Sequence, residues 1–562
     1  MNFRKTFILT ASILCISTVS FAAPSMPNIG DVLKQTEPVK DIPQKKTQVP
    51  EIKSQIRPAL KKSDIGSVFV KGFKVIGNNA VSAEKLESVA NQPENINKDM
   101  SLAGMEAVAS QVTRYYRSNG YFVARAYIPK QDMKDGVVEI AVLEGEYGEF
   151  HLKNDSLVKD KTVQGMLNNV KSKGVISTDT IERAMLIIND THGASVTQAD
   201  VMPGAEVGTS DFNIGVSATP RLSGYVIADN HGMRYTGKNR LIAGLSVNSP
   251  FGIGDRISLT GMTSSTGDVK NGRLAYSFPI LYSGLTGGLA YSRTDYSLGE
   301  EYEELDATGK SDNLEMTISY PFIKSRFETL NANLGVYSKQ LKDEIESMDI
   351  VTKKRTVSVT AGVDYSKQYR LFGLNNETAV NGYYTMGHLK FDDEEDEAAD
   401  KLGPDTNGLY NKLNLEATQS TVFNRSFSTV LSFQGQYALN NKNLDGSEDL
   451  SIGGAYGVRV FPSGEKSGEN GYILNAEGFY TLPVYKGFTN KLSLFVDSGY
   501  ARPADDNLDE KGRHLTDAGI GYYLNYRAFF LKAHYARIIG GTVVESEPDY
   551  KNKFLIQGGL SF

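Results

Sequence analysis

The 562-residue sequence predicts a transmembrane antiparallel β-barrel of sixteen strands, preceded by two small α+β domains. Three observations lead to this fold class. Residues 217–562 alternate like strands, show no helical period, and divide into units of about 22 residues, each a strand with its connection. The connections in this region alternate between short and long. Ahead of it, residues 67–216 repeat one order of strands and helices twice.

The first 22 residues are predicted to be an export signal. A basic start and an apolar stretch, residues 4–19, precede the small-residue cleavage site Ser20-Phe21-Ala22. The only cysteine, Cys15, lies within this signal, so the mature chain would contain no disulfide. We therefore expect the protein to work outside the cytoplasm without a disulfide framework.

Residues 23–66 are rich in proline and lysine, which favours an extended linker. One short piece could be helical, because Ile29, Val32 and Leu33 fall on one face between two prolines. A tether without regular structure throughout is the alternative, and the sequence leaves both open.

Residues 67–145 have the pattern of one small α+β domain. The expected elements are a strand at 68–75, a helix capped by Ser82, a helix at 101–118, and strands at 123–128 and 137–143. Residues 146–216 repeat this order as a second domain, with elements expected at 149–153, 162–168, 178–189, 195–201 and 211–216. Such a repeat favours a modular binding arm over a single catalytic fold.

Residues 217–562 contain strand candidates of about ten residues each, the length that crosses an outer membrane. Their expected starts are near Arg221, Arg240, Asp255, Asn271, Leu285, Ser311, Glu328, Lys353, Leu374, Leu409, Phe427, Gly471, Asn490, Arg513, Ala528 and Phe554. The chain ends in an alternating strand, in which Leu560 and Phe562 share one face. A terminal aromatic residue suits a lipid-facing strand that closes the barrel.

The connections between these strands sort by length. The short ones are expected at 249–254, 278–282, 422–425 and 482–487. The long, charged ones are expected at 299–310, 343–354, 392–405, 442–470, 504–511 and 541–551. Outer-membrane barrels have short periplasmic turns and long outer loops, and the long set falls where connections from odd to even strands face outward. A soluble β-protein has no reason to sort its loops in this way.

The sequence contains no enzyme signature, and we expect no catalytic residue, metal or cofactor. The six histidines lack the spacing of a helical metal pair, and neither a nucleophile elbow nor a phosphate loop is found. The acidic run 392–397 lacks the spaced ligands of a calcium loop and is expected to be a solvated outer loop. A net charge of -6 argues against nucleic acid as a partner.

Ordered motifs along the chain resemble the two-partner secretion transporters, the haemolysin and filamentous-haemagglutinin secretion and activation family of type V secretion. Four of them resemble the first polypeptide-transport-associated (POTRA) domain: Phe73-Lys74-Val75-Ile76-Gly77-Asn78, the stretches 115–121 and 124–129, and Asp135-Gly136-Val137-Val138-Glu139-Ile140 with Glu144-Gly145. Residues 203–211 resemble the close of the second POTRA domain, and residues 222–237 resemble the opening strand of the barrel. The likeness covers nearly all of the mature chain.

The resemblance implies a protein-transport function in the bacterial outer membrane. Two periplasmic POTRA domains would capture an unfolded exoprotein, a large β-helical adhesin or cytolysin, and the barrel would secrete it without ATP. Further expected partners are outer-membrane lipids with lipopolysaccharide and the barrel assembly machinery during biogenesis. Two alternatives stay open: an outer-membrane protein assembly factor of the same superfamily, and a passive solute porin with a structural arm.

The resemblance also implies a site in the longest connection. Val458, Arg459 and Phe461 match the tip of the family's pore loop, although Val460 and Phe461 depart from its pattern. In the family this loop folds back into the pore, and its arginine pairs with a wall aspartate. An arginine fork matches a carboxylate, and charges away from water are costly unless paired. The expected wall residues are Phe495, Asp497 and Gly499.

Two further sites are expected. An extended substrate can add to a free sheet edge, and the candidate edge is the strand with Val123, Arg125 and Tyr127. The segment 28–37 resembles the family's pore-plugging N-terminal helix.

Overall fold

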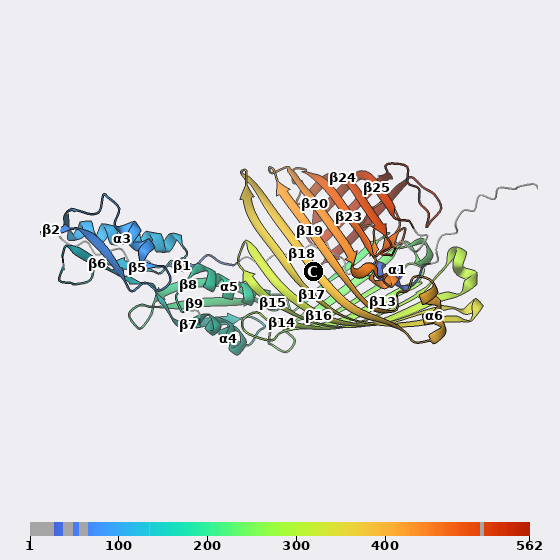
Figure 1. The fold of residues 1–562 in the computed structure, drawn as a ribbon, viewed down its shortest axis with the longest axis horizontal. Helices are drawn as coiled ribbons and strands as arrows, with labels where there is room; N and C mark the ends of the chain where they lie inside the picture. Colours follow the sequence, from blue (N-terminus) through green and yellow to red (C-terminus); the bar gives the residue numbers. More distant parts are fainter. Residues whose placement is uncertain (1–26, 37–48, 55–65, 134, 173, 506–510) are drawn as a thin grey trace, which may run out of the picture.

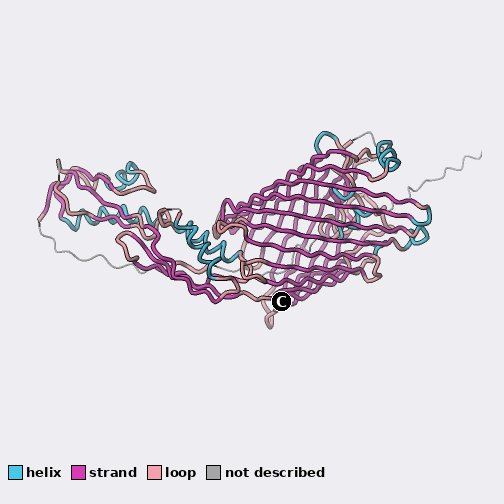
Figure 2. Tube along the Cα trace, turned by 90° about the horizontal axis from the view of Figure 1, so that it is seen from below, coloured by secondary structure: helices cyan, strands magenta, loops and turns pink. Residues whose placement is uncertain are grey.

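The computed structural model describes residues 27–36, 49–54, 66–133, 135–172, 174–505 and 511–562. The export signal expected at 1–22 lies outside the described residues. The molecule is elongated, with two small domains in a row beside one end of a barrel (Figures 1 and 2). Within the described part of the chain, no helix is long and apolar enough to cross a membrane.

Sixteen antiparallel strands close into a barrel, in which β27 pairs with β10. Their bounds are β10 Leu222–Asp229, β11 Arg240–Asn248, β12 Arg256–Ser264, β13 Val269–Pro279, β14 Thr286–Ser297, β15 Ala307–Lys324, β16 Glu328–Ile345, β17 Ile350–Leu371, β18 Leu374–Phe391, β19 Gly408–Val422, β20 Phe427–Ala438, β23 Asn470–Thr481, β24 Thr489–Arg502, β25 Arg513–Tyr526, β26 Phe529–Ile538 and β27 Asn552–Ser561. The predicted barrel of sixteen strands is confirmed. The sequence could predict it because alternation with a period of two is a local signal that identifies each strand.

The predicted strand length was wrong on one side of the barrel. The strands β15, β16 and β18 have 18 residues each and β17 has 22, against the expected ten or so. The long connection expected at 343–354 is therefore mostly strand, since only residues 346–349 lie between β16 and β17. The outward face of these extensions carries charged residues such as Lys353 and Arg355, so the ladder continues beyond the expected membrane-spanning part.

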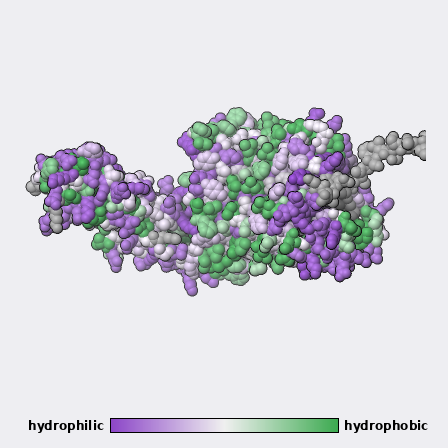
Figure 3. All heavy atoms as spheres, viewed as in Figure 1, coloured by the Kyte–Doolittle hydropathy of each residue, from purple (hydrophilic) through white to green (hydrophobic). Residues whose placement is uncertain are grey.

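The barrel's outside is apolar in its middle part and polar at the end away from the small domains, as the face in Figure 3 shows. Short helices lie in the connections at that polar end: η1 Arg234–Thr236, η2 Glu300–Leu305, η3 Glu346–Met348 and α6 Glu394–Leu402. In Figure 1, α6 lies at the end far from the small domains.

The first small domain has a three-stranded sheet in the order β3-β6-β5 and a two-stranded ladder of β2 and β4. Its elements are β2 Ser67–Val70, β3 Gly72–Ile76, α2 Ala83–Ala90, β4 Lys98–Ser101, α3 Leu102–Ser118, β5 Arg125–Tyr127 and β6 Val137–Leu143. The single strand predicted at 68–75 is two strands, because β2 pairs with β4 whereas β3 pairs with β6. Buried Tyr116 donates to Glu144 at 2.7 Å, and burial beside this carboxylate raises the pKa of Tyr116.

The second domain has a four-stranded sheet in the order β1-β8-β9-β7 with two helices. Its elements are β7 Glu146–Asp155, α4 Asp160–Lys171, α5 Thr178–Asp190, β8 Ala194–Pro203 and β9 Thr209–Ala218. Phe150 and Phe212 stack in its core with ring centroids 5.2 Å apart. The sequence did not predict β1 Lys53–Ser54, which pairs in parallel with β8 and brings part of the linker into this sheet.

Two segments lie within the barrel lumen. One is α1 Ile29–Gln35, which is labelled among the barrel strands in Figure 1. The other is the connection from β20 to β23, residues 439–469, which includes η4 Leu439–Asn441, η5 Gly446–Glu448, β21 Leu450–Ser451 and β22 Ser467–Gly468. We call this connection the lumen loop.

Candidate functional site

The lumen loop folds into a hairpin whose tip is buried against the barrel wall. Strands β21 and β22 pair to form its stem. At the tip, Val458, Val460 and Phe461 are completely buried. A side chain at Gly457 would place its Cβ 2.4 Å from the carbonyl oxygen of Ile452, so the tight turn requires glycine.

The side chain of Arg459 reaches three groups of the wall. Its Nε lies 3.1 Å from Asp497 Oδ2, and its Nη2 lies 2.7 Å from Glu477 Oε2. Its guanidinium carbon is 3.9 Å from the ring centroid of Phe495, which is cation–π contact. Arg459 is only 7% exposed and Asp497 is fully buried, so neither charge has water to replace its partner. The structure thus brings together Arg459, Asp497 and Phe495, the contact that the family resemblance implied.

The wall also holds the backbone of the tip. Asp497 accepts a hydrogen bond from the amide of Arg459 at 3.4 Å, and Asp517 accepts one from the amide of Val460 at 2.6 Å. Asn475 donates to the carbonyl oxygen of Gly457 at 2.9 Å. These bonds fix the position of the main chain as well as the arginine side chain.

Gly499 makes room for the tip. A Cβ at this position would lie 3.1 Å from Ile452 and from Val458. That separation is tighter than ordinary van der Waals contact, so a larger side chain would push the loop away from β24.

Sequence reasoning missed Glu477, Asn475 and Asp517. All three lie on β23 or β25, the neighbours of β24, at positions that face the lumen. The alternation along each strand was the signal that could have found them. These three polar residues occupy inward positions, and the outward positions beside them hold apolar residues. Register was also needed, since it places Asp497 directly opposite both Asn475 and Asp517.

The base of the lumen loop is tied to other strands of the barrel. Asp445 Oδ2 lies 2.5 Å from Lys354 Nζ on β17. Glu448 lies 2.5 Å from Lys339 on β16 and 2.8 Å from Lys412 on β19. Since the tip is held by β23 to β25 and the base by β16 to β19, the loop crosses the lumen.

Helix α1 packs against the base of the loop. A Cβ at Gly30 would lie 2.5 Å from the carbonyl carbon of Gly446, so the two backbones are in direct contact. The amide of Ile29 donates to Asp343 at 3.0 Å, and Lys34 Nζ donates to Ser467 at 2.9 Å. Of the two readings that the sequence left open for this segment, the structure has the helix, and it shares the lumen with the loop.

The last strand closes the barrel at Phe562 and Leu560. The backbone of Phe562 exchanges two hydrogen bonds of 2.9 Å with Gly224, and Leu560 is paired with Val226. Phe562 is 69% exposed, and Leu560 also faces outward.

The candidate binding edge is shorter than predicted. Strand β5 pairs only with β6, so its other side is an edge of the sheet, where the amide of Ala126 donates to the hydroxyl of Thr113 on α3 at 2.9 Å. Arg125 and Tyr127 lie on this strand and are exposed. Val123 lies before the strand and packs against the core of the second domain, so its inclusion in the edge was wrong. This contact between the domains could not be seen in the local alternation.

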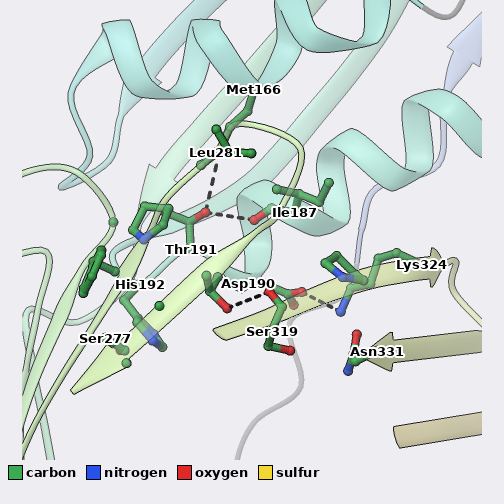
Figure 4. Close-up of a pocket in the computed structure, with 18 of the residues that line it drawn as sticks. Met166, Ile187, Asp190, Thr191, His192, Ser277, Leu281, Ser319, Lys324 and Asn331 are labelled. Atoms are coloured by element: carbon green, nitrogen blue, oxygen red, sulfur yellow. Dashed lines mark hydrogen bonds and ion pairs between the residues drawn. The ribbon is translucent and has the colours of Figure 1, made fainter. Parts of the chain in front are cut away.

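The second domain is docked onto the barrel around a cavity of about 350 Å³ (Figure 4). Asp190 at the end of α5 lies 2.5 Å from Lys324 on β15, and the two side chains face each other in Figure 4. Glu182 and Arg326 form a second ion pair at 2.6 Å. Burial, with the charge of Arg256 nearby, lowers the pKa of His192 in this junction to about 4.

The chain matches two family models. The model of the haemolysin secretion/activation protein ShlB/FhaC/HecB matches residues 208–524, and the model of the ShlB-type POTRA domain matches residues 68–145. The heme/hemopexin transporter protein HuxB of Haemophilus influenzae (strain ATCC 51907 / DSM 11121 / KW20 / Rd) is 30% identical over 420 residues, which cover 72% of this chain and 71% of that protein. The outer membrane transporter CdiB of Dickeya dadantii (strain 3937) is 26% identical over 431 residues, 73% of each chain.

Solved structures share the fold. CdiB from Escherichia coli superimposes with a TM-score of 0.74 at 21% identity, covering 90% of this chain and 93% of that chain. BamA from Haemophilus ducreyi lacking POTRA domains 1–3 superimposes with a TM-score of only 0.52 at 15% identity, covering 88% and 100%. The chain therefore belongs to the haemolysin secretion/activation protein family, the two-partner secretion transporters of the outer membrane, with its POTRA domains in the periplasm.

Proposed function

We propose that this transporter threads one large unfolded exoprotein through the barrel, and that α1 and the lumen loop together close the pore at rest. The observation that carries the proposal is their shared position in the lumen, where Gly30 meets Gly446 and the loop crosses to Arg459. Secretion then requires α1 to leave its place. The Arg459 contacts keep the loop tip on the wall while α1 moves.

The POTRA domains would capture the exoprotein before it enters the barrel. An extended segment would pair with the edge of β5, which carries Arg125 and Tyr127, by replacing Thr113, whose hydroxyl accepts a hydrogen bond from the amide of Ala126 at 2.9 Å. Main-chain pairing depends little on the side chains of the substrate, which suits a substrate that arrives unfolded. The periplasm lacks ATP, so folding of the exoprotein outside the cell would supply the direction.

The cargo class is proposed to be a β-helical adhesin or cytolysin. Among the relatives, HuxB is named a heme/hemopexin transporter and a protein of Proteus mirabilis is named hemolysin transporter HpmB. Activation of the cargo during export is a further proposal.

We also propose contacts with lipopolysaccharide and insertion by the barrel assembly machinery. The proposed domain boundaries along the chain are residues 22, 66, 145 and 216.

Deletion of the gene tests the proposal. We expect the culture medium to lose one large protein, and its level to return with the wild-type gene. A variant that lacks the first POTRA domain, residues 67–145, should not restore it. An unchanged set of secreted proteins would contradict the proposal.

An assembly factor of the same superfamily is the second candidate, favoured only by the shared fold with BamA. Deletion would then reduce the folded fraction of other outer-membrane barrels, measured by their heat-dependent migration on gels. We expect that fraction to be unchanged.

A further inference from the structure

The outward surface of β15–β18 is an apolar band that ends in cations toward the outer loops. On β17, Val359 and Val357 are 39% and 47% exposed, and the next outward positions toward the loop are Arg355 and Lys353. The neighbouring strands reach their outward cations one or two positions further on: Lys310 follows Asp312 on β15, Lys342 follows Gln340 on β16, and Lys390 follows His388 on β18. Their outward apolar residues are Leu314, Met316, Leu334, Val336, Tyr384 and Met386. Since residues two apart share a face, the cations face the lipid side of the wall.

Strand register brings five cations together. Lys310 is directly opposite Lys342, and Lys342 is directly opposite Lys353. One step closer to the apolar band, Arg355 is directly opposite Lys390. Cβ atoms of opposite residues are about 5 Å apart, and like charges in such pairs are destabilising. We call Lys310, Lys342, Lys353, Arg355 and Lys390 the basic rim.

Two carboxylates adjoin this cluster, Glu344 on β16 and Asp295 on β14, which is directly opposite Lys310. Glu344 forms an ion pair with Lys342 and also interacts with the charges of Lys310 and Lys353. Among the residues that the structure describes, Lys353 and Arg355 have no ion-pair partner, and the same holds for Lys310 and Lys390. The next acids along the rows, Asp295 and Asp312, are paired with Arg293 on β14. The basic rim therefore holds an excess of positive charge.

The height of the basic rim above the apolar band can be compared with the thickness of the outer membrane. The outward positions from residue 357 to residue 365 of β17 span nine residues, about 30 Å of strand, or about 21 Å of height at a tilt of 45°. This matches the apolar band of an outer-membrane barrel, about 25 Å tall. Arg355 is the first outward residue above it and Lys353 the second, which places both at the level of the outer-leaflet headgroups.

We propose that the basic rim binds the phosphates of lipopolysaccharide in the outer leaflet. The ligand is a phosphorylated glycolipid whose acyl chains lie along the apolar band of β15–β18. Its phosphates would relieve the repulsion among the five cations, since charge-assisted contacts with Lys and Arg are strong. The inference rests on the proposed function, which includes contacts with lipopolysaccharide, and it assigns those contacts to a site.

The test uses the full-length protein in detergent micelles and bisphosphorylated lipid A as the probe. The variant is Lys353→Gln with Arg355→Gln, and the control is Lys367→Gln with Arg370→Gln at the periplasmic end of the same strand. Native mass spectrometry measures bound lipid A against its concentration. We expect the apparent Kd to rise about 25-fold in the variant, because each of the two cations contributes about fivefold. The control should stay within about twofold of the wild type.

Three further measurements separate the outcomes. The swap of Lys353→Arg with Arg355→Lys should keep the affinity, which shows that a loss reflects charge rather than misfolding. Lipid A without phosphates should bind the wild type no better than intact lipid A binds the variant. Inorganic phosphate at millimolar concentration should not compete. Equal binding by the variant and the wild type, equal binding of dephosphorylated lipid A, or displacement by inorganic phosphate would each overturn the proposal. The variant should still secrete, so its result is independent of the export mechanism.

Discussion

Replacing Arg459 by alanine should release the tip of the lumen loop from the wall and reduce secretion. The substitution removes two ion pairs and a cation–π contact, and it leaves Asp497 and Glu477 buried without their cation. Removal of one partner of a buried pair costs about 3–5 kcal/mol. This shifts the equilibrium between docked and released tip by roughly 150- to 4,000-fold.

Arg459→Lys separates charge from geometry. A lysine keeps the positive charge, but its ammonium cannot bind both Asp497 and Glu477 as the two edges of the guanidinium do. We expect it to lose about 1.5–3 kcal/mol, the value of one hydrogen bond to a charged group, and to secrete at an intermediate level. The matched control is Arg425→Ala, which removes an exposed arginine from a periplasmic turn and should secrete like the wild type.

Two assays read the result. Secretion is measured as exoprotein in the medium, with barrel assembly checked by heat-dependent migration on gels. Tip release is measured by thiol labelling of Val458→Cys, which is buried in the wild type. The chain has only Cys15, in the predicted signal, so no other thiol interferes. Wild-type secretion by an assembled Arg459→Ala variant, or a tip that stays protected in it, would refute the reasoning.

Three other perturbations follow from the packing and charges of the site. Gly30→Val should unseat α1, because its Cβ would lie 2.5 Å from Gly446, and single-channel conductance in planar bilayers should rise; an unchanged conductance would count against the plug. Gly499→Val should displace the loop tip and cut secretion about tenfold or more, whereas Gly272→Val, which has open space, should be neutral; equal secretion by both would be the contrary result. Since the folded pKa of His192 is about 4 and its ordinary value is 6.5, the unfolded chain binds more protons between these values. Stability of the docked second domain is therefore full above pH 6.5 and falls by at most about 3 kcal/mol toward pH 4, measured by denaturant unfolding of the full chain; His192→Gln should remove that slope.

The sequence by itself determined the architecture of this protein. A strand of period two, a short turn and a long loop are local patterns, so each of the sixteen barrel strands could be found from its own residues. The repeat at 67–216 likewise predicted two small domains, whereas the apolar face at Ile29–Gln35 left a helix and an unstructured tether both open. The pairing of Arg459 with Asp497 was predicted from resemblance, since their separation in the chain carries no local signal.

Only the tertiary structure decided which distant residues meet. The register of β23, β24 and β25 places Glu477 and Asp517 around the loop tip, and the register of β15–β18 aligns the basic rim. It also showed that β1 joins the second domain and that Val123 packs between the domains. The physical reason is that alternation fixes only the face of the wall that a side chain occupies. Its neighbours across the strands depend on register and closure, which are properties of the whole barrel.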